Sequence, residues 1–297
     1  MSKVREVLIQ GIEGSNHHIA ALDFFGGEQV EVVACHSFRS LFAELAAHPE
    51  AIGVAAMENT LAGSLLANYT LLRQSGRSIL GEYKMRISHQ LLALPGQSID
   101  ELAEVHSHPM ALAQCEAFFT QHPHIRLVES EDTALSAKVI ADQQISGRAA
   151  IASSLAATLF KLDTLAAGIE TNPHNFTRFL VIGNAENWND PVEAAAGLID
   201  KSSLVFSLPH EAGSLSKILS MLSYFNLNLT KIQSMPVIGA EWEYLFYVDF
   251  TFQDHMLYRA AIEAIRPLCS KLSVLGEYLT HEGRLALKPE KSLKTAV

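Results

Sequence analysis

Hydrophobic positions in the first 180 residues form short runs that alternate with stretches of helical spacing. Residues 4–9 predict a strand, a glycine-containing turn follows at 11–15, and residues 18–25 predict a helix. The alternation continues, with strands expected at 52–56, 87–94 and 149–151 and helices at 38–45, 109–120, 133–143 and 153–160. Strands alternating with helices predict an α/β fold with a mostly parallel sheet.

Two breaks inside this region predict two lobes that face a cleft. Pro95-Gly96 and the polar stretch 76–82 interrupt the hydrophobic pattern. We therefore expect residues 1–186 to form one domain, with lobe one at about 1–80 plus 165–186 and lobe two at about 81–164.

The pattern changes after this region. Residues 187–201 are polar and alanine-rich and predict a linker, residues 202–281 predict a second domain, and residues 282–297 predict a loose tail. Expected in the second domain are strand 203–209, helix 213–225, strand 228–236, strand 242–252, helix 255–266 and strand 270–279. This βαββαβ order is typical of a ferredoxin-like sandwich. Such small domains often pair sheet to sheet, so we expect a homodimer or homotetramer.

Composition and charge narrow the classes of partner. The chain has 297 residues, 48% hydrophobic and 18% charged, with a net charge of -10. No cluster of Lys and Arg appears on a predicted helix, which disfavours nucleic acid and membrane surfaces. Three widely separated cysteines suit reduced thiols, and the apolar run at the N-terminus breaks at Gln10 and Glu13, too early for a signal peptide. We therefore expect a soluble cytoplasmic protein.

Residues 175–179, Asn-Phe-Thr-Arg-Phe, carry the most informative chemistry. A permanently charged guanidinium beside a hydroxyl, between two aromatic rings, suits holding an acidic small molecule while donating a hydrogen bond to it. Taken alone, however, the stretch fits better as the start of strand 179–182, with Arg178 in solvent. The case for a site depends on the other segments.

The turn at 11–15 offers a seat for an anion. Gly11, Gly14 and Ser15 lie between a strand and a helix, where free backbone N–H groups face outward at the positive end of the helix. The spacing is neither a dinucleotide fingerprint nor a Walker loop, so nucleotide binding is disfavoured. By itself the motif is more often a tight turn that binds nothing.

Residues 58–63 follow a buried strand and lie at its carboxyl end, where open α/β sheets bind ligands. Asn59 and Thr60 offer amide and hydroxyl donors there, although both residue types also suit a helix cap.

At 107–115, Pro109 predicts the start of a helix, with Ser107 and His108 at its amino end. His106, His108 and Cys115 fit no usual set of zinc ligands, so we expect no metal and no cofactor. His17-His18 and His122-Pro123-His124 are interpreted as exposed polar residues. The groups found suit a reaction that needs orientation more than strong acid–base catalysis.

Six segments in the first domain together resemble the prephenate dehydratase family, in its form with a C-terminal ACT domain. They are GIEGS at 11–15, ENTLAG at 58–63, SHPMALAQC at 107–115, DTALSAK at 132–138, AAIAS at 149–153 and NFTRF at 175–179. Residues 203–219 and 228–236 are similar to the ACT domain's phenylalanine-responsive loops. The resemblance implies a two-lobed, periplasmic-binding-protein-like catalytic domain and loss of carbon dioxide and water from prephenate.

The resemblance also implies roles for individual residues. Thr177 would donate a hydrogen bond to the leaving hydroxyl, Arg178 would pair with a carboxylate, and Phe179 would orient the ring. The rest of the substrate site would comprise Ser15, Asn59, Thr60, Gly63, Ser107, Gln114, Thr133, Ser153 and Asn175. L-phenylalanine would bind as an effector at Gly213, Ser214, Leu215, Asn228, Leu229, Gln233, Ser234 and Pro236.

Departures from the family pattern leave two questions open. The opening motif usually carries proline, threonine, an aromatic residue and serine where this chain has Ile12, Ser15, Asn16 and His17. Prephenate and its amino analogue arogenate therefore both remain possible substrates. In the second domain the usual G-A-L-V and E-S-R-P are replaced by residues 213–216 and 233–236, which could weaken effector binding. A two-lobed protein that only senses a small acid is the third alternative.

Overall fold

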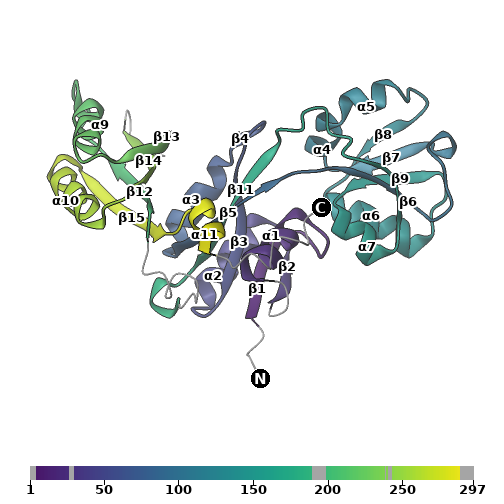
Figure 1. Cartoon of the computed structure of the whole chain (residues 1–297), viewed down its shortest axis with the longest axis horizontal. Helices are drawn as coiled ribbons and strands as arrows, with labels where there is room; N and C mark the ends of the chain where they lie inside the picture. The colour runs from purple at the N-terminus through teal and green to yellow at the C-terminus, as the bar shows by residue number, and fades with distance from the viewer. Residues whose placement is uncertain (1–4, 27–29, 189–198, 238, 240–242, 288–297) are drawn as a thin grey trace. The chain divides into compact units, whose positions relative to one another are not determined.

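The computed structural model describes residues 5–26, 30–188, 199–237, 239 and 243–287 (Figure 1). The chain divides into two compact units. Unit 1 comprises Met1–Leu71 and Lys84–Phe179, and unit 2 comprises Leu72–Tyr83 and Leu180–Val297. One boundary falls inside helix α3 (Leu66–Ser75), and the other two fall inside strands β5 (Ser78–Arg86) and β11 (Phe176–Gly183).

The first sheet has the strand order β2-β1-β3-β11-β5, with β4 paired to β3. Its remaining strands are β1 (Arg5–Gln10), β2 (Val30–Cys35), β3 (Ile52–Asn59) and β4 (Gly63–Ser64). Strand β1 pairs in parallel with both β2 and β3, as the α/β pattern predicted. The helices of this part of the chain are α1 (Asn16–Phe25), α2 (Phe38–Ala47) and α3 (Leu66–Ser75).

The second sheet has the order β10-β6-β9-β7-β8 and mixes parallel with antiparallel pairs. Its core is closed by fully buried apolar side chains such as Leu91, Val105 and Ile151. The strands are β6 (Gln90–Ala93), β7 (Glu104–Ser107), β8 (Arg126–Glu129), β9 (Arg148–Ala152) and β10 (Asp163–Ala167). The helices are η1 (Ile99–Glu101), α4 (Pro109–Gln114), α5 (Glu116–Thr120), α6 (Thr133–Gln143) and α7 (Ser154–Phe160).

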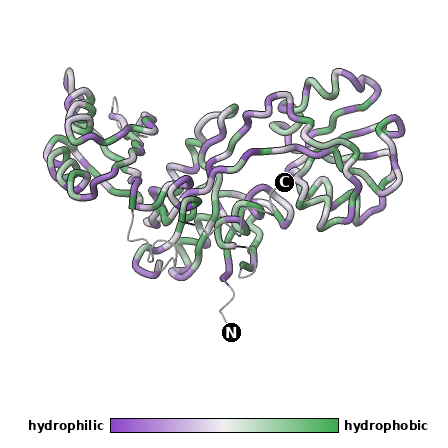
Figure 2. The backbone as a smooth tube through the Cα atoms, viewed as in Figure 1, coloured by the Kyte–Doolittle hydropathy of each residue, from purple (hydrophilic) through white to green (hydrophobic). Residues whose placement is uncertain are grey.

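Unit 2 contains an antiparallel sheet of order β13-β14-β12-β15 with two helices, in the predicted order βαββαβ. Side chains of β12 and β14 such as Leu204, Phe206, Val248 and Phe250 form one core with Ile218. The elements are η2 (Ala185–Asn187), β12 (Lys201–Ser207), α9 (Ser214–Tyr224), β13 (Asn228–Pro236), β14 (Tyr244–Thr251), α10 (His255–Ile265), η3 (Arg266–Leu268), β15 (Lys271–Tyr278) and α11 (His281–Leu287). In Figure 2 hydrophobic and hydrophilic colours alternate along single elements, as expected for segments that bury one face.

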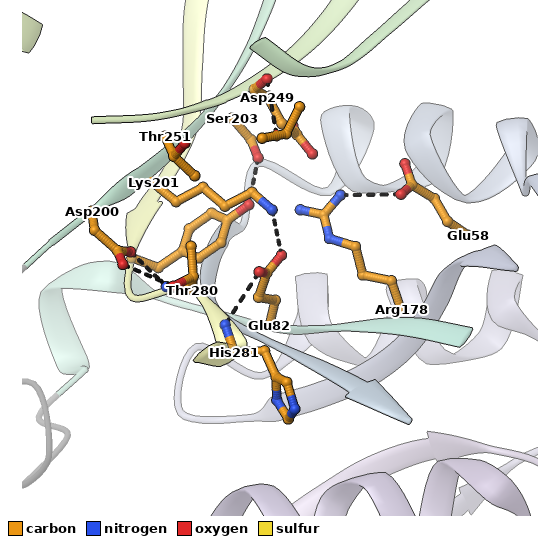
Figure 3. A network of polar contacts seen from close by, with 12 residues as sticks. Glu58, Glu82, Arg178, Asp200, Lys201, Ser203, Asp249, Thr251, Thr280 and His281 are labelled. Carbon is orange, nitrogen blue, oxygen red and sulfur yellow. Dashed lines mark hydrogen bonds and ion pairs between the residues drawn. The ribbon is translucent and has the colours of Figure 1, made fainter. Parts of the chain in front are cut away.

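The opposite face of β12 is buried but polar. The Lys201 ammonium lies 2.7 Å from a Glu82 carboxylate oxygen, with the two side chains 5% and 0% exposed. The other Glu82 oxygen accepts a hydrogen bond from the backbone N–H of His281 at 3.2 Å (Figure 3). Strands β5 and β15 approach so closely that a Cβ on Gly276 would lie 2.3 Å from the carbonyl oxygen of Ile79. These contacts lie within unit 2 and fix residues 78–83 against its sheet.

Three expectations from the sequence need correction. The stretch 76–82 is not simply a break, because strand β5 runs through it and its charged residue Glu82 has a buried partner. The helix expected at 109–120 is two short helices that meet at Cys115. The tail expected from 282 begins as helix α11 with Arg284 buried, while residues 288–297 lie outside the described part of the chain. Trp242, expected on strand 242–252, is also outside it.

Among the described residues, no helix combines the length and the apolar character needed to span a bilayer.

Candidate active site

Thr177 lies near the start of β11 and is only 8% exposed. The Asn59 side-chain N–H donates to the Thr177 Oγ1 atom at 3.0 Å. Since the hydroxyl oxygen accepts this bond, its own hydrogen remains available for another acceptor. Asn59 is held by its turn, where its Oδ1 accepts from the backbone N–H groups of Leu61 and Ala62 at 3.0 and 2.9 Å. It serves the turn and does not cap a helix.

A chain of side-chain amides extends from Asn59. Its Nδ2 also donates to Asn175 Oδ1 at 2.7 Å, and Asn175 Nδ2 donates to Gln114 Oε1 at 2.9 Å. Thr60 supports the same region, because its hydroxyl donates to the carbonyl of His174 and accepts from the backbone N–H of Phe176. The structure thus brings together residues from three separate sequence segments, at 58–63, 107–115 and 175–179.

Arg178 is 7% exposed and directed at an acidic group, so the alternative of a solvated guanidinium does not hold. Its Nη1 lies 3.4 Å from Glu58 Oε2 (Figure 3). The Tyr69 hydroxyl donates to the other Glu58 oxygen at 2.8 Å. No local pattern could have indicated this pairing, since Glu58 and Arg178 lie 120 positions apart.

Three helix amino ends converge on the turn at 11–15. Ser15 caps α1 and Ser153 caps α7, and the Ser153 hydroxyl donates to the carbonyl oxygen of Gly14 at 2.6 Å. Asp132 caps α6, and a Cβ on Gly11 would lie 3.0 Å from its carboxylate. Both glycines have positive φ, 91° and 86°, which other residues adopt only with strain. Partial positive charge at helix amino ends favours an anion here.

His17, in the first turn of helix α1, connects this helix to strands β3 and β11. Its Nε2 accepts from the backbone N–H of Ala56 at 3.1 Å, and its ring meets the Phe179 ring edge-on at 5.1 Å between centroids. Burial lowers the pKa of His17 to about 4, so the ring is neutral at pH 7 and can accept. The interpretation of His17-His18 as exposed polar residues was wrong, because both are buried.

The remaining expected site residues occupy different surroundings. Ser107 is fully buried, and its hydroxyl donates to the Ile151 carbonyl at 2.7 Å. Thr133 is the first residue of α6, Phe179 is buried against His17, and Gly63 is exposed in β4. The expected effector residues lie at the start of α9 (Gly213, Ser214, Leu215) and along the edge strand β13 (Asn228, Leu229, Gln233, Ser234, Pro236).

Two further residues were missed by sequence reasoning. His89 is 4% exposed and its Nε2 lies 2.8 Å from Gln114 Oε1, with its pKa lowered mainly by burial. Burial also raises the pKa of the Asp132 carboxyl, against the opposing hydrogen bonds from the amides of α6. Neither residue stands out in the sequence, because a histidine in a strand-like run and an aspartate before a helix have ordinary structural roles.

The described residues contain no group of three or more His, Cys, Asp or Glu side chains placed to hold a metal ion. His106 Nε2 instead lies 2.8 Å from Glu104 Oε2. Burial raises the pKa of Cys115 to about 12, so its thiol stays protonated at neutral pH.

Comparison with known proteins shows the family. The family described as "Prephenate dehydratase" matches residues 7–187. An Arabidopsis thaliana protein named "Arogenate dehydratase/prephenate dehydratase 2, chloroplastic" is 36% identical over 289 residues, covering 93% of this chain and 73% of that protein.

Two solved structures share the fold over nearly the whole chain. The quorum quenching acylase GqqA is 27% identical, with a TM-score of 0.81, over 93% of this chain and 98% of that one. Prephenate dehydratase from Arthrobacter aurescens, solved in complex with L-Phe, is 23% identical, with a TM-score of 0.82, over 94% of this chain and 91% of that one.

Proposed function

The chain belongs to the prephenate dehydratase family of hydro-lyases, and we propose a role for each group of its site in turning prephenate into phenylpyruvate. In this reaction the ring of the substrate becomes aromatic as carbon dioxide leaves one carbon and hydroxide leaves the opposite carbon. Aromatisation supplies much of the driving force. The protein must therefore bind a dicarboxylate, orient it and assist the departing hydroxyl.

Thr177 assists the hydroxyl, and the observation that carries this proposal is its bond with Asn59. The amide donates to Oγ1 at 3.0 Å. This bond holds the hydroxyl oxygen in place and leaves the threonine O–H available as a donor. An alcohol is too weak an acid to transfer its proton fully in the ground state, so Thr177 acts by a hydrogen bond that strengthens as negative charge develops on the leaving oxygen.

The two carboxylates of the substrate are met by positive groups. Arg178 pairs with one of them, and Glu58 holds the guanidinium in place beforehand. The amino ends of α1 and α7 attract the other through backbone N–H groups. The substrate site is completed by Ser15, Asn59, Thr60, Gly63, Ser107, Gln114, Thr133, Ser153, Asn175 and Phe179.

The likeness to GqqA makes acyl hydrolysis a competing activity, and the serine contacts argue against it. A serine nucleophile needs a base that accepts its proton. Ser153 and Ser107 instead donate to the backbone carbonyls of Gly14 and Ile151. We expect no release of fatty acid from an acyl-homoserine lactone. Release that survives Thr177→Ala would point to a separate acylase function.

Purified protein given prephenate or arogenate tests the proposal and identifies the substrate. Dehydration of prephenate yields phenylpyruvate, whereas arogenate yields phenylalanine, so the two products distinguish the substrates. The relative named for both activities makes arogenate the second candidate. We expect prephenate to be preferred. Binding of both acids without turnover would instead support a sensing protein.

The βαββαβ part of unit 2 acts as an ACT regulatory domain that binds L-phenylalanine and inhibits the enzyme. The start of α9 and the edge strand β13 carry the expected effector residues, and the exposed edge of β13 suits pairing with a second copy in a homodimer or homotetramer. Free cysteines suit a cytoplasmic location. Calorimetry with L-phenylalanine and light scattering test binding and assembly, and an absence of binding heat would count against the effector.

A further inference from the structure

We propose that His89 is a positioning residue for the reaction, because it fixes the amide of Gln114 and so anchors one end of the hydrogen-bond chain that runs through Asn175 and Asn59 to the Thr177 hydroxyl. This inference rests on the role proposed for Thr177. His89 is far from the other site segments in the sequence, and it joins them only through this chain of hydrogen bonds.

The contacts of Gln114 determine which atom of its amide faces His89. Gln114 Oε1 lies 2.8 Å from His89 Nε2 and accepts from Asn175 Nδ2 at 2.9 Å. An amide oxygen only accepts, so His89 carries its hydrogen on Nε2. Turning the amide over would place the Gln114 NH₂ group against the NH₂ group of Asn175. The imidazole N–H therefore selects one of two orientations of Gln114.

That choice passes along the chain without a break. Asn175 uses its Nδ2 on Gln114 and so presents its Oδ1 to Asn59, at 2.7 Å. Asn59 must then present its Nδ2, which also donates to Thr177 at 3.0 Å. The turn holds Asn59 in the same orientation from the other side, because its Oδ1 accepts from the backbone N–H groups of Leu61 and Ala62. The turn and His89 thus hold the chain from its two ends, and without the His89 donor the Gln114 end could shift and misalign the Asn59–Thr177 hydrogen bond.

The surroundings of His89 keep its ring in place. Its backbone N–H donates to Glu170 Oε2 at 2.9 Å, and Arg86 Nη2 pairs with the other Glu170 oxygen at 2.9 Å. His89 and Glu170 are 4% and 8% exposed. Asn175, the next member of the chain, is fully buried, so water cannot readily interrupt the chain between Gln114 and Asn59.

Replacing the ring tests the proposal with a matched pair of variants. His89→Phe keeps an aromatic ring and removes the donor, and we expect kcat to fall roughly 10- to 100-fold with KM within about threefold, the loss from one misdirected donor. His89→Gln returns an amide N–H and should recover most of this loss. Thermal melting of both variants separates the effect from folding, and His89→Leu, which also lacks a donor, replaces His89→Phe if the latter melts below the assay temperature.

A double variant tells whether His89 acts through Thr177. In a Thr177→Ala background, His89→Phe should cost less than about a further twofold, because the group it positions is already absent. Unchanged kcat in His89→Phe, a loss confined to KM, no recovery in His89→Gln, or full additivity would each overturn the inference. Normal turnover in Thr177→Ala alone would instead overturn the proposed role of Thr177.

Discussion

Two regions of this molecule bury polar groups in different ways. Around Thr177 the buried groups are mostly neutral amides and hydroxyls, joined in a directed chain from Gln114 through Asn175 to Asn59. On the polar face of β12 the buried groups are a full ion pair, Lys201 and Glu82, at 2.7 Å.

The difference concerns what each region leaves unsatisfied. The amide chain ends in a hydroxyl that still has a hydrogen to give, whereas both charges of the ion pair are matched inside the protein. A directed neutral chain can act on a ligand without an uncompensated charge in the empty site. A matched ion pair instead favours one specific packing of the segments that carry its two charges, here β5 and β12.

The largest effect is expected from removing the Thr177 hydroxyl in the first region. Thr177→Ala should lower kcat roughly 10²- to 10⁴-fold with the fold intact, the usual loss for a positioned donor. Thr177→Ser keeps the hydroxyl and should retain far more activity. Steady-state kinetics with prephenate and a melting curve provide the measurement, and turnover within a few-fold of wild type would remove Thr177 from the mechanism.

Breaking the second region should affect folding and leave the chemistry alone. Glu82→Gln removes the carboxylate that pairs with the buried Lys201 ammonium and should cost about 3–5 kcal/mol of unfolding free energy. The double variant Glu82→Leu/Lys201→Met replaces both charges with apolar groups and should be close to neutral. Denaturant unfolding compares them. If the single and double variants are equally destabilised, the effect comes from lost packing.

The buried histidine of the first region predicts a dependence of stability on pH. Burial lowers the His17 pKa from 6.5 to about 4, so between these values the unfolded chain binds more protons. The contribution of neutral His17 to the free energy of unfolding is therefore fully present above pH 6.5. It falls by up to about 3 kcal/mol as the pH decreases toward 4. His17→Gln should flatten this part of the profile, while His124→Gln, at an exposed residue, should not. Equal slopes in all three proteins would exclude His17 as the cause.

The smallest effect is expected from a variant of Arg178 that keeps its charge and changes its geometry. Arg178→Lys keeps the charge and loses the planar fork, so KM for prephenate should rise roughly tenfold with a smaller change in kcat. Glu58→Gln serves as the companion variant, because it removes the negative charge that pairs with the Arg178 guanidinium. An unchanged KM in Arg178→Lys would contradict pairing with a substrate carboxylate.

The sequence allowed the strand–helix alternation of the first domain and the βαββαβ order of the second to be predicted, because most of these elements carry their own periodicity, but strand β5 was taken for a break. The six motifs also led to Thr177, Asn59, Asn175 and Gln114, which lie in direct hydrogen-bonding contact. His89 and the Lys201–Glu82 pair could not be predicted. Their importance comes from partners 25 and 119 positions away, and local patterns contain no information about such pairings.

The position of Glu82 also bears on how the protein can be dissected. A truncation after residue 186 would keep Glu82 on β5 while deleting Lys201 and the backbone N–H of His281. It would also uncover Ile79, against which Gly276 packs so tightly that no side chain fits between them. A separately expressed N-terminal piece therefore needs Glu82 and its neighbours redesigned for solvent before its activity can be compared with that of the intact enzyme.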